Sequence, residues 1–281
     1  MEDASLPISV VISTYNAERW LEKVFLGYFV QTHKRFEIIV ADDGSGPATA
    51  KVVAAFAAYG SIPIHHVWHE DRGYRRQEIL NKAIKQSRHD YLVFTDGDCI
   101  PRRDFLAVHA RMATPGRFLS GGYCKLDSRT SLMLDEGDII EGTCFTPGWL
   151  RSHQRLGMSN WLKLGSGPFA ASVLDATTTA RATFNNCNSS AWKRDLLTVN
   201  GYDERMKYGG ADRELGERLV NAGIIGMQIR HRAVCVHLDH ERPYKTAESL
   251  RNSREIRRET RKLRRITTPY GIGRDGDAHV A

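Results

Sequence analysis

The sequence has no long apolar run. Among 281 residues, 41% hydrophobic and 26% charged, no segment approaches the roughly 20 apolar residues that a membrane-spanning helix needs. The opening residues, MEDASLPISVVISTYN, are acidic, and their apolar run is too short for a signal peptide. The composition is typical of a globular protein, and we expect a cytoplasmic one.

Cysteine is scarce and irregularly spaced. The chain has five cysteines and no C-x-x-C pair; they are Cys99, Cys124, Cys144, Cys187 and Cys235. An odd number without such pairs argues against a structural zinc site and against a disulfide framework. Reduced thiols are therefore expected.

Nearly all of the net positive charge lies in one short segment. The formal net charge is +7, and residues 245–265 supply +6 of it, from nine basic and three acidic side chains. Leu250, Ile256 and Leu263 lie roughly along one stripe of this segment, which predicts a basic helix. Such a helix can bind an anionic membrane surface, where each basic residue contributes about 1 kcal/mol. A solvated helix, or one packed on another copy of the chain, is the alternative.

Strand-like and helix-like segments alternate through the first hundred residues. Apolar, β-branched runs predict strands at 8–14, 36–45, 62–70 and 91–96, and apolar residues at helical spacing separate them. This order predicts an α/β fold with a mostly parallel sheet flanked by helices. Ligands of such sheets bind beyond the carboxyl ends of the strands. Those ends read STYN, ADDGS, HEDRGYR and TDGD.

The fourth strand ends in two carboxylates, Asp96 and Asp98, separated by Gly97. Residues two apart in an extended chain point to the same side, so both carboxylates can converge on one point. A hard divalent cation, Mg²⁺ or Mn²⁺, takes such oxygen ligands and commonly bridges them to substrate phosphates. The alternative is a surface turn, because Asp-Gly is a common turn dipeptide.

Five segments in a fixed order carry a resemblance to a known family. They are VVISTYNAERWLEKVFLGYFVQT, FEIIVADDGS, NKAIKQSRHDYLVFTDGDCIP, FNNCNSSAWKRDLLTVNGYDE and GGADRELGERL. From about residue 7 to residue 240, the chain resembles the family 2 inverting glycosyltransferases of the GT-A fold, of the bacterial surface-polysaccharide type. The five segments in this order are specific to that family, whereas any one of them alone would not be.

The resemblance implies a nucleotide site at the first two strand ends. The residues that match the segments holding the base and ribose are Ser13, Thr14, Tyr15, Asp42 and Asp43. An Asp at this place can accept a hydrogen bond from a uracil N–H. The resemblance therefore implies a UDP-sugar donor.

The same resemblance assigns roles to later residues. Asp96 matches the first acid of the D-x-D motif, near the ribose, and Asp98 matches the second, on a Mn²⁺ or Mg²⁺ ion that bridges the diphosphate. His237 matches a histidine that completes the metal shell in some members. Asp212 matches the catalytic base; a simple helix cap is the alternative. His240 lies three residues beyond His237, and strand geometry would point the two apart.

Basic residues follow the third predicted strand. Arg75 and Arg76 lie at a strand-to-helix junction on the same edge, and one of them can neutralise diphosphate oxygens. The other is expected on a solvated face. His65, His66 and His69 alternate with apolar residues, and we interpret them as strand residues without a ligand role.

Two departures from the family pattern limit the functional prediction. Ala211 stands where many members have Glu, which leaves contacts with the acceptor open. The Q-x-x-R-W motif of processive members is absent, so we expect the addition of one sugar. The expected acceptor is a hydroxyl of a glycan or lipid-linked glycan, such as a lipopolysaccharide or capsule precursor. That substrate fits a cytoplasmic enzyme peripheral to the inner face of the plasma membrane.

The resemblance also suggests how the chain is divided. We expect a catalytic domain over 1–244, with a nucleotide-binding half over about 1–125 and an acceptor-binding half over about 126–244. A basic helix (245–267) and a flexible tail (268–281) follow. Residues 125–180, rich in glycine, proline and tryptophan, are expected to form long loops over a site or a disordered insertion.

Two other functions remain open at this point. A magnesium-dependent nucleotidyltransferase would also use paired carboxylates, but it usually begins with a glycine-rich, basic phosphate loop, and the first turn here is STYNAER. A nucleic-acid-binding protein would explain the basic segment, but not the acids at the strand ends, which would repel phosphate. We therefore expect no nucleic-acid partner.

Overall fold

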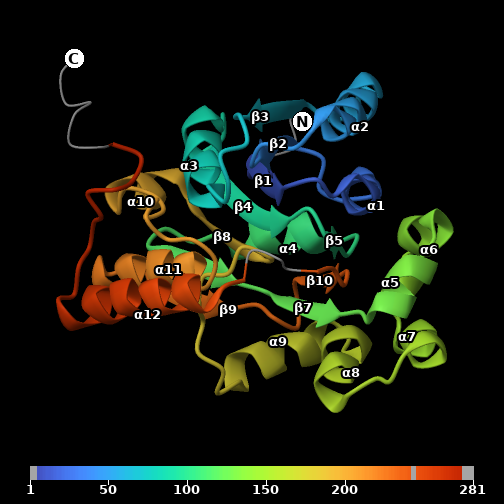
Figure 1. The fold of residues 1–281 in the computed structure, drawn as a ribbon. Helices are drawn as coiled ribbons and strands as arrows, with labels where there is room; N and C mark the ends of the chain where they lie inside the picture. Colours follow the sequence, from blue (N-terminus) through green and yellow to red (C-terminus); the bar gives the residue numbers. More distant parts are fainter. Residues whose placement is uncertain (1–4, 242–244, 274–281) are drawn as a thin grey trace.

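A seven-stranded sheet forms the centre of the molecule (Figure 1). The computed structural model describes residues 5–241 and 245–273. The strand order is β3-β2-β1-β4-β8-β6-β9. Its strands are β1 (Ile8–Thr14), β2 (Phe36–Asp42), β3 (Ile64–Trp68), β4 (Tyr91–Asp96), β6 (Arg117–Ser120), β8 (Ser189–Trp192) and β9 (Ile225–Gln228). The first four strands are mutually parallel, and β8 runs antiparallel to β4 and β6.

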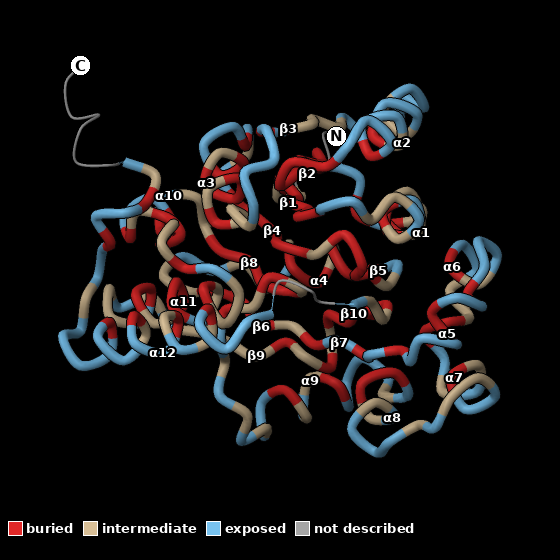
Figure 2. Tube along the Cα trace, viewed as in Figure 1, coloured by how far each residue is buried: buried red, intermediate tan, exposed pale blue. Residues whose placement is uncertain are grey.

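Helices cover both faces of this sheet. They are α1 (Glu18–Phe29), α2 (Pro47–Ala58), α3 (Arg76–Gln86), α4 (Phe105–Met112), α10 (Lys193–Thr198), α11 (Ala211–Asn221) and α12 (Ala247–Lys262). Successive strand residues point to opposite faces: Val10 belongs to the core under α1 and α2, and Val11 to the core under α3 and α11. Figure 2 shows these central strands buried. The predicted α/β class, with a mostly parallel sheet flanked by helices, is confirmed.

A second, three-stranded sheet lies beyond the carboxyl end of β4. It consists of β5 (Cys99–Pro101), β10 (Val234–His237) and β7 (Gly122–Lys125), in that order. β10 runs antiparallel to β5 and pairs His237 with Cys99. This sheet brings a late part of the chain to the turn that follows β4.

Residues 126–177 are largely helical, so the expectation of long loops or a disordered insertion is wrong. The elements are α5 (Ser128–Met133), α6 (Glu136–Glu141), a 3₁₀ helix η1 (Thr143–Phe145), α7 (Pro147–His153), α8 (Met158–Gly165) and α9 (Pro168–Thr177). Side-chain caps stabilise α5, α6 and α7: Asp127, Asp135 and Thr146 each accept a hydrogen bond from the first turn. Helices this short carry little amphipathic pattern, which hides them in the sequence.

The basic helix packs on the body of the protein. Ile256 is buried against the core under α11, and Thr260 Oγ1 donates a hydrogen bond to Glu214 of α11 at 2.8 Å. In the expected tail, the carbonyl oxygens of Thr268 and Gly273 accept hydrogen bonds from Asn200 Nδ2. The flexibility of 268–281 stays a prediction, and 274–281 lie outside the described residues. Among the described residues, no helix has the length and apolar character needed to cross a bilayer.

Candidate functional site

A cleft of about 1010 Å³ opens at the carboxyl ends of β1, β2 and β4. The strand register sets its position, because Thr14 is level with Asp42 and Ser13 is level with Asp96. The sequence-predicted residues that line it are Ser13, Thr14, Tyr15, Asp43, Arg76, Asp96, Asp98 and His237. Asp42, Arg75 and Asp212 are not among the lining residues.

Asp96, Ser13 and Arg76 form one network at the base of the cleft. Ser13 Oγ donates to Asp96 Oδ1 at 3.0 Å, and Arg76 Nη2 donates to Ser13 Oγ at 2.7 Å. Arg76 also forms an ion pair with Asp96. The cleft therefore holds a guanidinium fixed by two partners from two parallel strands.

Gly97 allows the turn between the two aspartates to sit close to β1. Its N–H donates to Ser13 O at 2.8 Å, and a Cβ at this position would lie 3.0 Å from Thr14 Oγ1. Asp98, with 9% of its surface exposed, lies in the cleft and not on an open surface. The interpretation of the motif as a simple surface turn is therefore wrong.

Asp98 faces two histidines from the segment that ends β10. Its Oδ2 lies 2.8 Å from His240 Nε2 and 3.9 Å from His237 Nε2. Burial raises the pKa of Asp98, but the His240 hydrogen bond and the two imidazoles outweigh it and hold this pKa at about 2. The prediction that His240 points away is wrong: β10 ends at His237, and beyond it the two rings stack with centroids 5.9 Å apart.

These three side chains can hold a metal ion. One donor atom from each of Asp98, His237 and His240 lies within 4.8 Å of the others. His237 Nδ1 is bonded to Leu238 O at 2.7 Å, which orients Nε2 toward Asp98. This set of one carboxylate and two imidazoles differs from the oxygen ligands that Mg²⁺ prefers.

The two acids at the end of β2 have different surroundings. Asp42 is fully buried and accepts hydrogen bonds from Ser45 N and His66, both at 2.8 Å. It therefore holds the backbone of the turn after β2. Asp43 lines the cleft and is held by His69 Nε2 at 2.8 Å. Burial raises the pKa of Asp43, although His69 opposes the shift. The histidines thus orient the two acids, a role that the sequence does not reveal.

Tyr15 and Asp71 form a second polar pair in the cleft. Tyr15 Oη donates to Asp71 Oδ2 at 2.9 Å, and this bond is the main reason that the pKa of Tyr15 is raised. Asp71 Oδ1 accepts from Gly73 N at 2.9 Å, which shapes the loop after β3. Sequence reasoning missed Asp71, although it lies in one of the four polar strand ends.

The structure separates the two arginines of the α3 junction. Arg76 lines the cleft. Arg75 forms an ion pair with Glu78 at 3.1 Å and bonds the backbone oxygen of Glu70. Of these two arginines, Arg76 is the one positioned to meet a ligand in the cleft.

Asp212 lies in the first turn of α11, behind the network of Asp96 and Arg76. Its Oδ1 accepts from Arg213 N at 2.8 Å, and its Oδ2 lies 3.4 Å from Asn186 N. Burial raises the pKa of Asp212, opposed by the Arg213 N–H and the charge of Arg76. The helix N-terminus favours the ionised form, but burial has the larger effect.

The segment 185–188, which sequence reasoning could not place, connects these parts. Asn186 contacts Asp212 as described above, and Cys187 lines the cleft. Asn188 Nδ2 donates to the carbonyl oxygens of Gly122 and Ala233, at 2.8 Å and 3.0 Å. The segment therefore joins α11 to the small sheet that carries His237.

Comparison with known proteins identifies a family that matches part of this chain. Residues 9–121 match the family described as glycosyl transferase family 2. The match covers less than half of the chain and assigns this part to the family 2 glycosyltransferases. The chain is 26% identical over 276 residues to an uncharacterized glycosyltransferase, YfnE of Bacillus subtilis, covering 86% of this chain and 67% of that protein.

Other relatives are longer than this chain. The chain is 29% identical over 250 residues to a validoxylamine A glucosyltransferase of Streptomyces hygroscopicus subsp. limoneus, covering 84% of this chain and 52% of that protein. It therefore spans about half of that relative. Chondroitin synthase of Pasteurella multocida is 23% identical over 245 residues, which cover 78% of this chain and 23% of the synthase.

Solved structures of the GT-A fold share the fold of this chain. The mannosyltransferase PcManGT of Pyrobaculum calidifontis, in complex with GDP-Man and Mn²⁺, has a TM-score of 0.56 at 20% identity, covering 94% of this chain and 65% of that one. TarS of S. aureus has a TM-score of 0.57 at 14% identity, covering 83% of this chain and 37% of that one. At these identities the likeness concerns the fold alone.

Proposed function

We propose that this enzyme is a metal-dependent, inverting, non-processive glycosyltransferase that moves one sugar from a UDP-sugar to a hydroxyl of a glycan acceptor. One observation carries the proposal: Asp98, His237 and His240 converge in the strand-end cleft, beside the guanidinium of Arg76. Family membership favours glycosyl transfer over nucleotidyl transfer. A solved relative of the same fold binds Mn²⁺ with a nucleotide sugar.

The first two strand ends are proposed to hold the nucleotide. Thr14 Oγ1 is buried in the cleft wall without a hydrogen-bond partner among the described residues, so a ligand hydroxyl can satisfy it. Asp43 lines the same wall and can accept from a uracil N–H, with His69 holding its carboxylate in place. The exposed ring of Tyr15 offers a surface on which a base can stack. TarS, which shares the fold, has been solved with UDP.

The reacting end is proposed to lie between Asp98 and Asp212. A divalent ion, when bound, supplies positive charge that stabilises the departing diphosphate. Asp98, His237 and His240 would hold that ion, and Arg76 would donate to diphosphate oxygens. Asp212 would take the proton of the acceptor hydroxyl; its raised pKa makes it a stronger base than an ordinary carboxylate. One displacement opposite the leaving group inverts the anomeric carbon.

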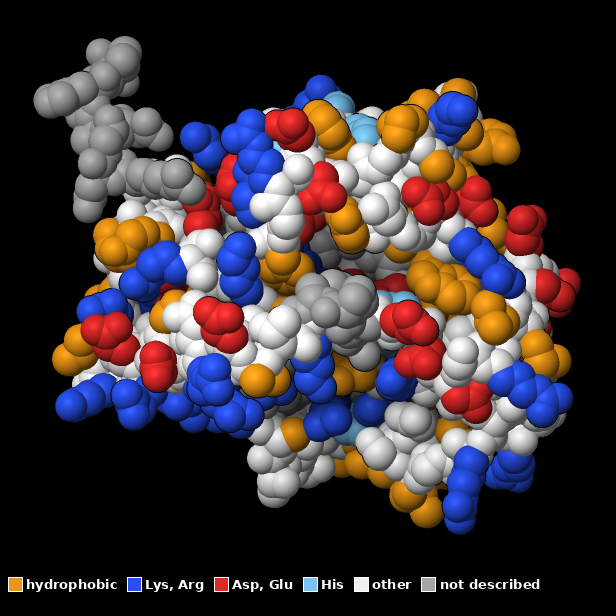
Figure 3. All heavy atoms as spheres, viewed as in Figure 1, with side chains coloured by type: hydrophobic (Ala, Val, Ile, Leu, Met, Phe, Trp, Pro, Cys, Tyr) orange, Lys and Arg blue, Asp and Glu red, His pale blue; other side chains and the backbone are white. Residues whose placement is uncertain are grey.

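The acceptor is proposed to be a lipid-linked glycan, such as a lipopolysaccharide or capsule precursor, bound over residues 126–244. The basic helix supports this choice. Its exposed basic residues are Arg251, Arg254, Arg258, Arg261, Lys262 and Arg264, and Figure 3 shows Lys and Arg gathered along α12. Ile256 packs inward, whereas Leu263 of the same stripe is exposed, so the proposed contact with an anionic membrane rests on the basic residues.

A thermal-shift titration tests the proposed function. The full chain is mixed with UDP, GDP or CMP, each with and without Mn²⁺, because a ligand that binds only the folded state raises the melting temperature. We expect a shift with UDP that requires Mn²⁺ and disappears in Asp98→Ala. No shift with any of the nucleotides would contradict the proposal, and a shift with GDP alone would contradict the UDP-sugar donor.

A further inference from the structure

Three cysteines that are far apart in the sequence lie together beneath the cleft. Cys99 begins β5, Cys187 lies in the segment before β8, and Cys235 belongs to β10. Cys99 and Cys235 are fully buried, whereas Cys187 lines the cleft. Cys235 Sγ lies 3.6 Å from the backbone oxygen of Cys187. No C-x-x-C spacing links these cysteines, so the sequence does not reveal the cluster.

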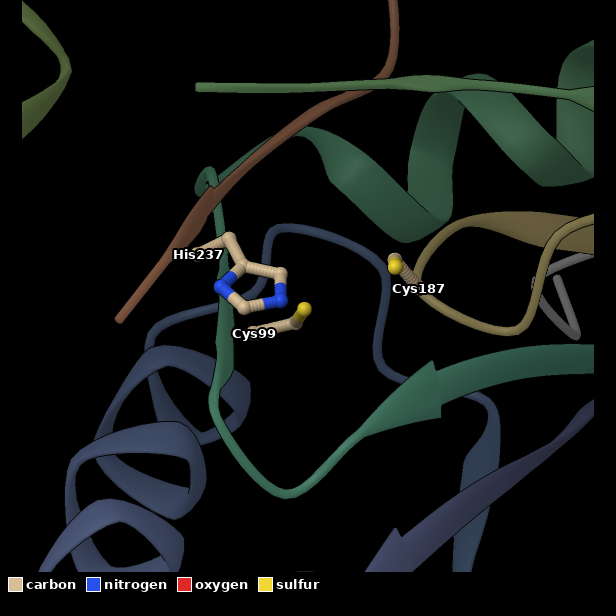
Figure 4. Close-up of side chains that lie close together, drawn as sticks. All are labelled: Cys99, Cys187 and His237. Carbon is tan, nitrogen blue, oxygen red and sulfur yellow. The ribbon is translucent and has the colours of Figure 1, made fainter. Parts of the chain in front are cut away.

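Two of these thiols share His237 as a neighbour. One donor atom from each of Cys99, Cys187 and His237 lies within 4.8 Å of the others. Figure 4 shows the imidazole with one nitrogen turned toward the sulfur of Cys99, and the sulfur of Cys187 on the loop across from them. Cys99 Sγ also lies 3.3 Å from Asp98 Oδ1, so the cluster adjoins the carboxylate of the proposed metal site.

We infer that Cys99 Sγ, Cys187 Sγ and His237 form a second metal site, selective for a thiophilic divalent ion of the zinc class. Zn²⁺ binds sulfur at about 2.3 Å in a tetrahedron, which places two sulfur ligands roughly 3.8 Å apart. The present spacing of up to 4.8 Å therefore needs side-chain movement of about 1 Å and no change of fold. Three protein ligands leave a fourth position for water or a substrate oxygen.

The chemistry of this set differs from that of Asp98 and its histidines. Burial raises the pKa of the Cys99 thiol, and hydrogen bonding with Cys99, followed by burial, raises that of Cys187. The thiols are protonated without a metal, and binding releases two protons to solvent as two thiolates form. Soft thiolate ligands favour Zn²⁺ over Mn²⁺ or Mg²⁺. The two neighbouring sites thus select different ions.

The two sites exclude one another because they share one imidazole. His237 Nε2 lies 3.9 Å from Asp98 Oδ2, and its ring also takes part in the thiol cluster. An ion bound by the two sulfurs would draw His237 away from Asp98. A zinc-class ion therefore acts as an inhibitor that competes with Mn²⁺.

Cobalt spectroscopy on the full chain tests this site without measuring activity. Co²⁺ bound by thiolates gives a charge-transfer absorption in the near ultraviolet, which Zn²⁺ abolishes on displacement. We expect one Co²⁺ per chain with this band in the wild type, and at least a tenfold weaker affinity in Cys187→Ala and Cys99→Ala. Cys144→Ala, which removes a buried thiol from η1, should keep the band.

Further variants separate this inference from the proposed function. Asp98→Ala should keep the cobalt band while losing the Mn²⁺-dependent UDP shift, because Asp98 belongs to the other site. If Cys187→Ala fails to fold, Cys187→Ser replaces it. Absence of the band in the wild type, or its persistence in both the Cys99 and the Cys187 variant, would overturn the thiol site. If the wild type shows the cobalt band but no melting-temperature shift with UDP, the proposed function is overturned and the thiol site is not.

Discussion

The carboxylate of Asp98 lies 2.8 Å from Nε2 of His240, a residue beyond the end of β10. This contact joins the turn after β4 to the segment that follows the small sheet. Both side chains lie in the wall of the cleft, together with His237. The late part of the chain therefore completes a site that begins at the fourth strand.

His240→Ala should weaken Mn²⁺ binding in the presence of UDP by about tenfold or more, because one of three protein donors is lost. Isothermal titration with Mn²⁺ at saturating UDP measures this change. His153→Ala is the matched control, since His153 stacks on Trp149 in α7, away from the cleft. Equal affinities in the wild type and His240→Ala would exclude His240 from the metal shell.

Arg76→Lys should weaken binding of the nucleotide diphosphate by about tenfold, with Arg76→Ala at least as severe. The ammonium group of a lysine cannot replace the guanidinium contacts with Ser13 and Asp96 and bind a phosphate at the same time. The dissociation constant of UDP is the quantity to measure. Arg75→Lys, one residue away and paired with Glu78, should change it by less than about twofold. A larger effect at Arg75 than at Arg76 would reverse this assignment.

Asp212→Asn should lower kcat by about 10² to 10⁴-fold, the range for loss of a general base, and leave the affinity for UDP near that of the wild type. Because burial raises the pKa of Asp212 and the base must be deprotonated, wild-type activity falls as pH drops through that raised pKa. This acid limb should vanish from the pH profile of the variant.

Asp195→Asn provides the control for Asp212. Asp195 is also a buried carboxyl in the first turn of a helix, α10, and it has a raised pKa, but its charged neighbour is Arg194 and not Arg76. Its removal should leave kcat within about twofold. A similar loss in both variants would indicate an effect on folding and not on proton transfer.

Arg218→Met should lower the free energy of unfolding by about 3 to 5 kcal/mol, because it leaves a buried charge without its partner. Arg218 and Glu214 pair at 2.8 Å with side chains 1% exposed, and Arg218 also donates to backbone oxygens of Val199 and Gly201. Urea denaturation measures the loss. Arg265→Met breaks an exposed pair with Glu259 and should cost less than about 1 kcal/mol.

Reversing three charges on α12, in Arg251→Glu, Arg254→Glu and Arg258→Glu together, should weaken binding to phosphatidylglycerol vesicles by about 100-fold at low salt, at about 1 kcal/mol per residue. Vesicle co-sedimentation at two salt concentrations measures it. The same reversal at Arg129, Arg151 and Arg155, which are exposed near α5 to α7, is the control. Equal binding by both triple variants would remove α12 from the proposed membrane contact.

The sequence predicts the local parts of this molecule better than the parts that depend on distant contacts. Strand ends such as Thr14 and Asp96 are readable because a buried strand followed by polar residues has a local signature. The pairing of His240 with Asp98 has no such local signature, because it depends on where the chain turns after β10. The cysteine cluster was missed for the same reason. Short capped helices in 126–177 were also missed, because six residues carry too little periodicity.

The strand order has a consequence for folding during synthesis. Strands β1 to β4 emerge first and can pair among themselves, yet the outer edge of β4 is covered only by β8, which is made after α4 to α9. Until then, the nascent chain exposes unpaired N–H and C=O groups along an apolar strand, Tyr91–Asp96. A pause of the ribosome between α4 and β8 would therefore prolong the interval in which this edge can join the edge of another nascent copy.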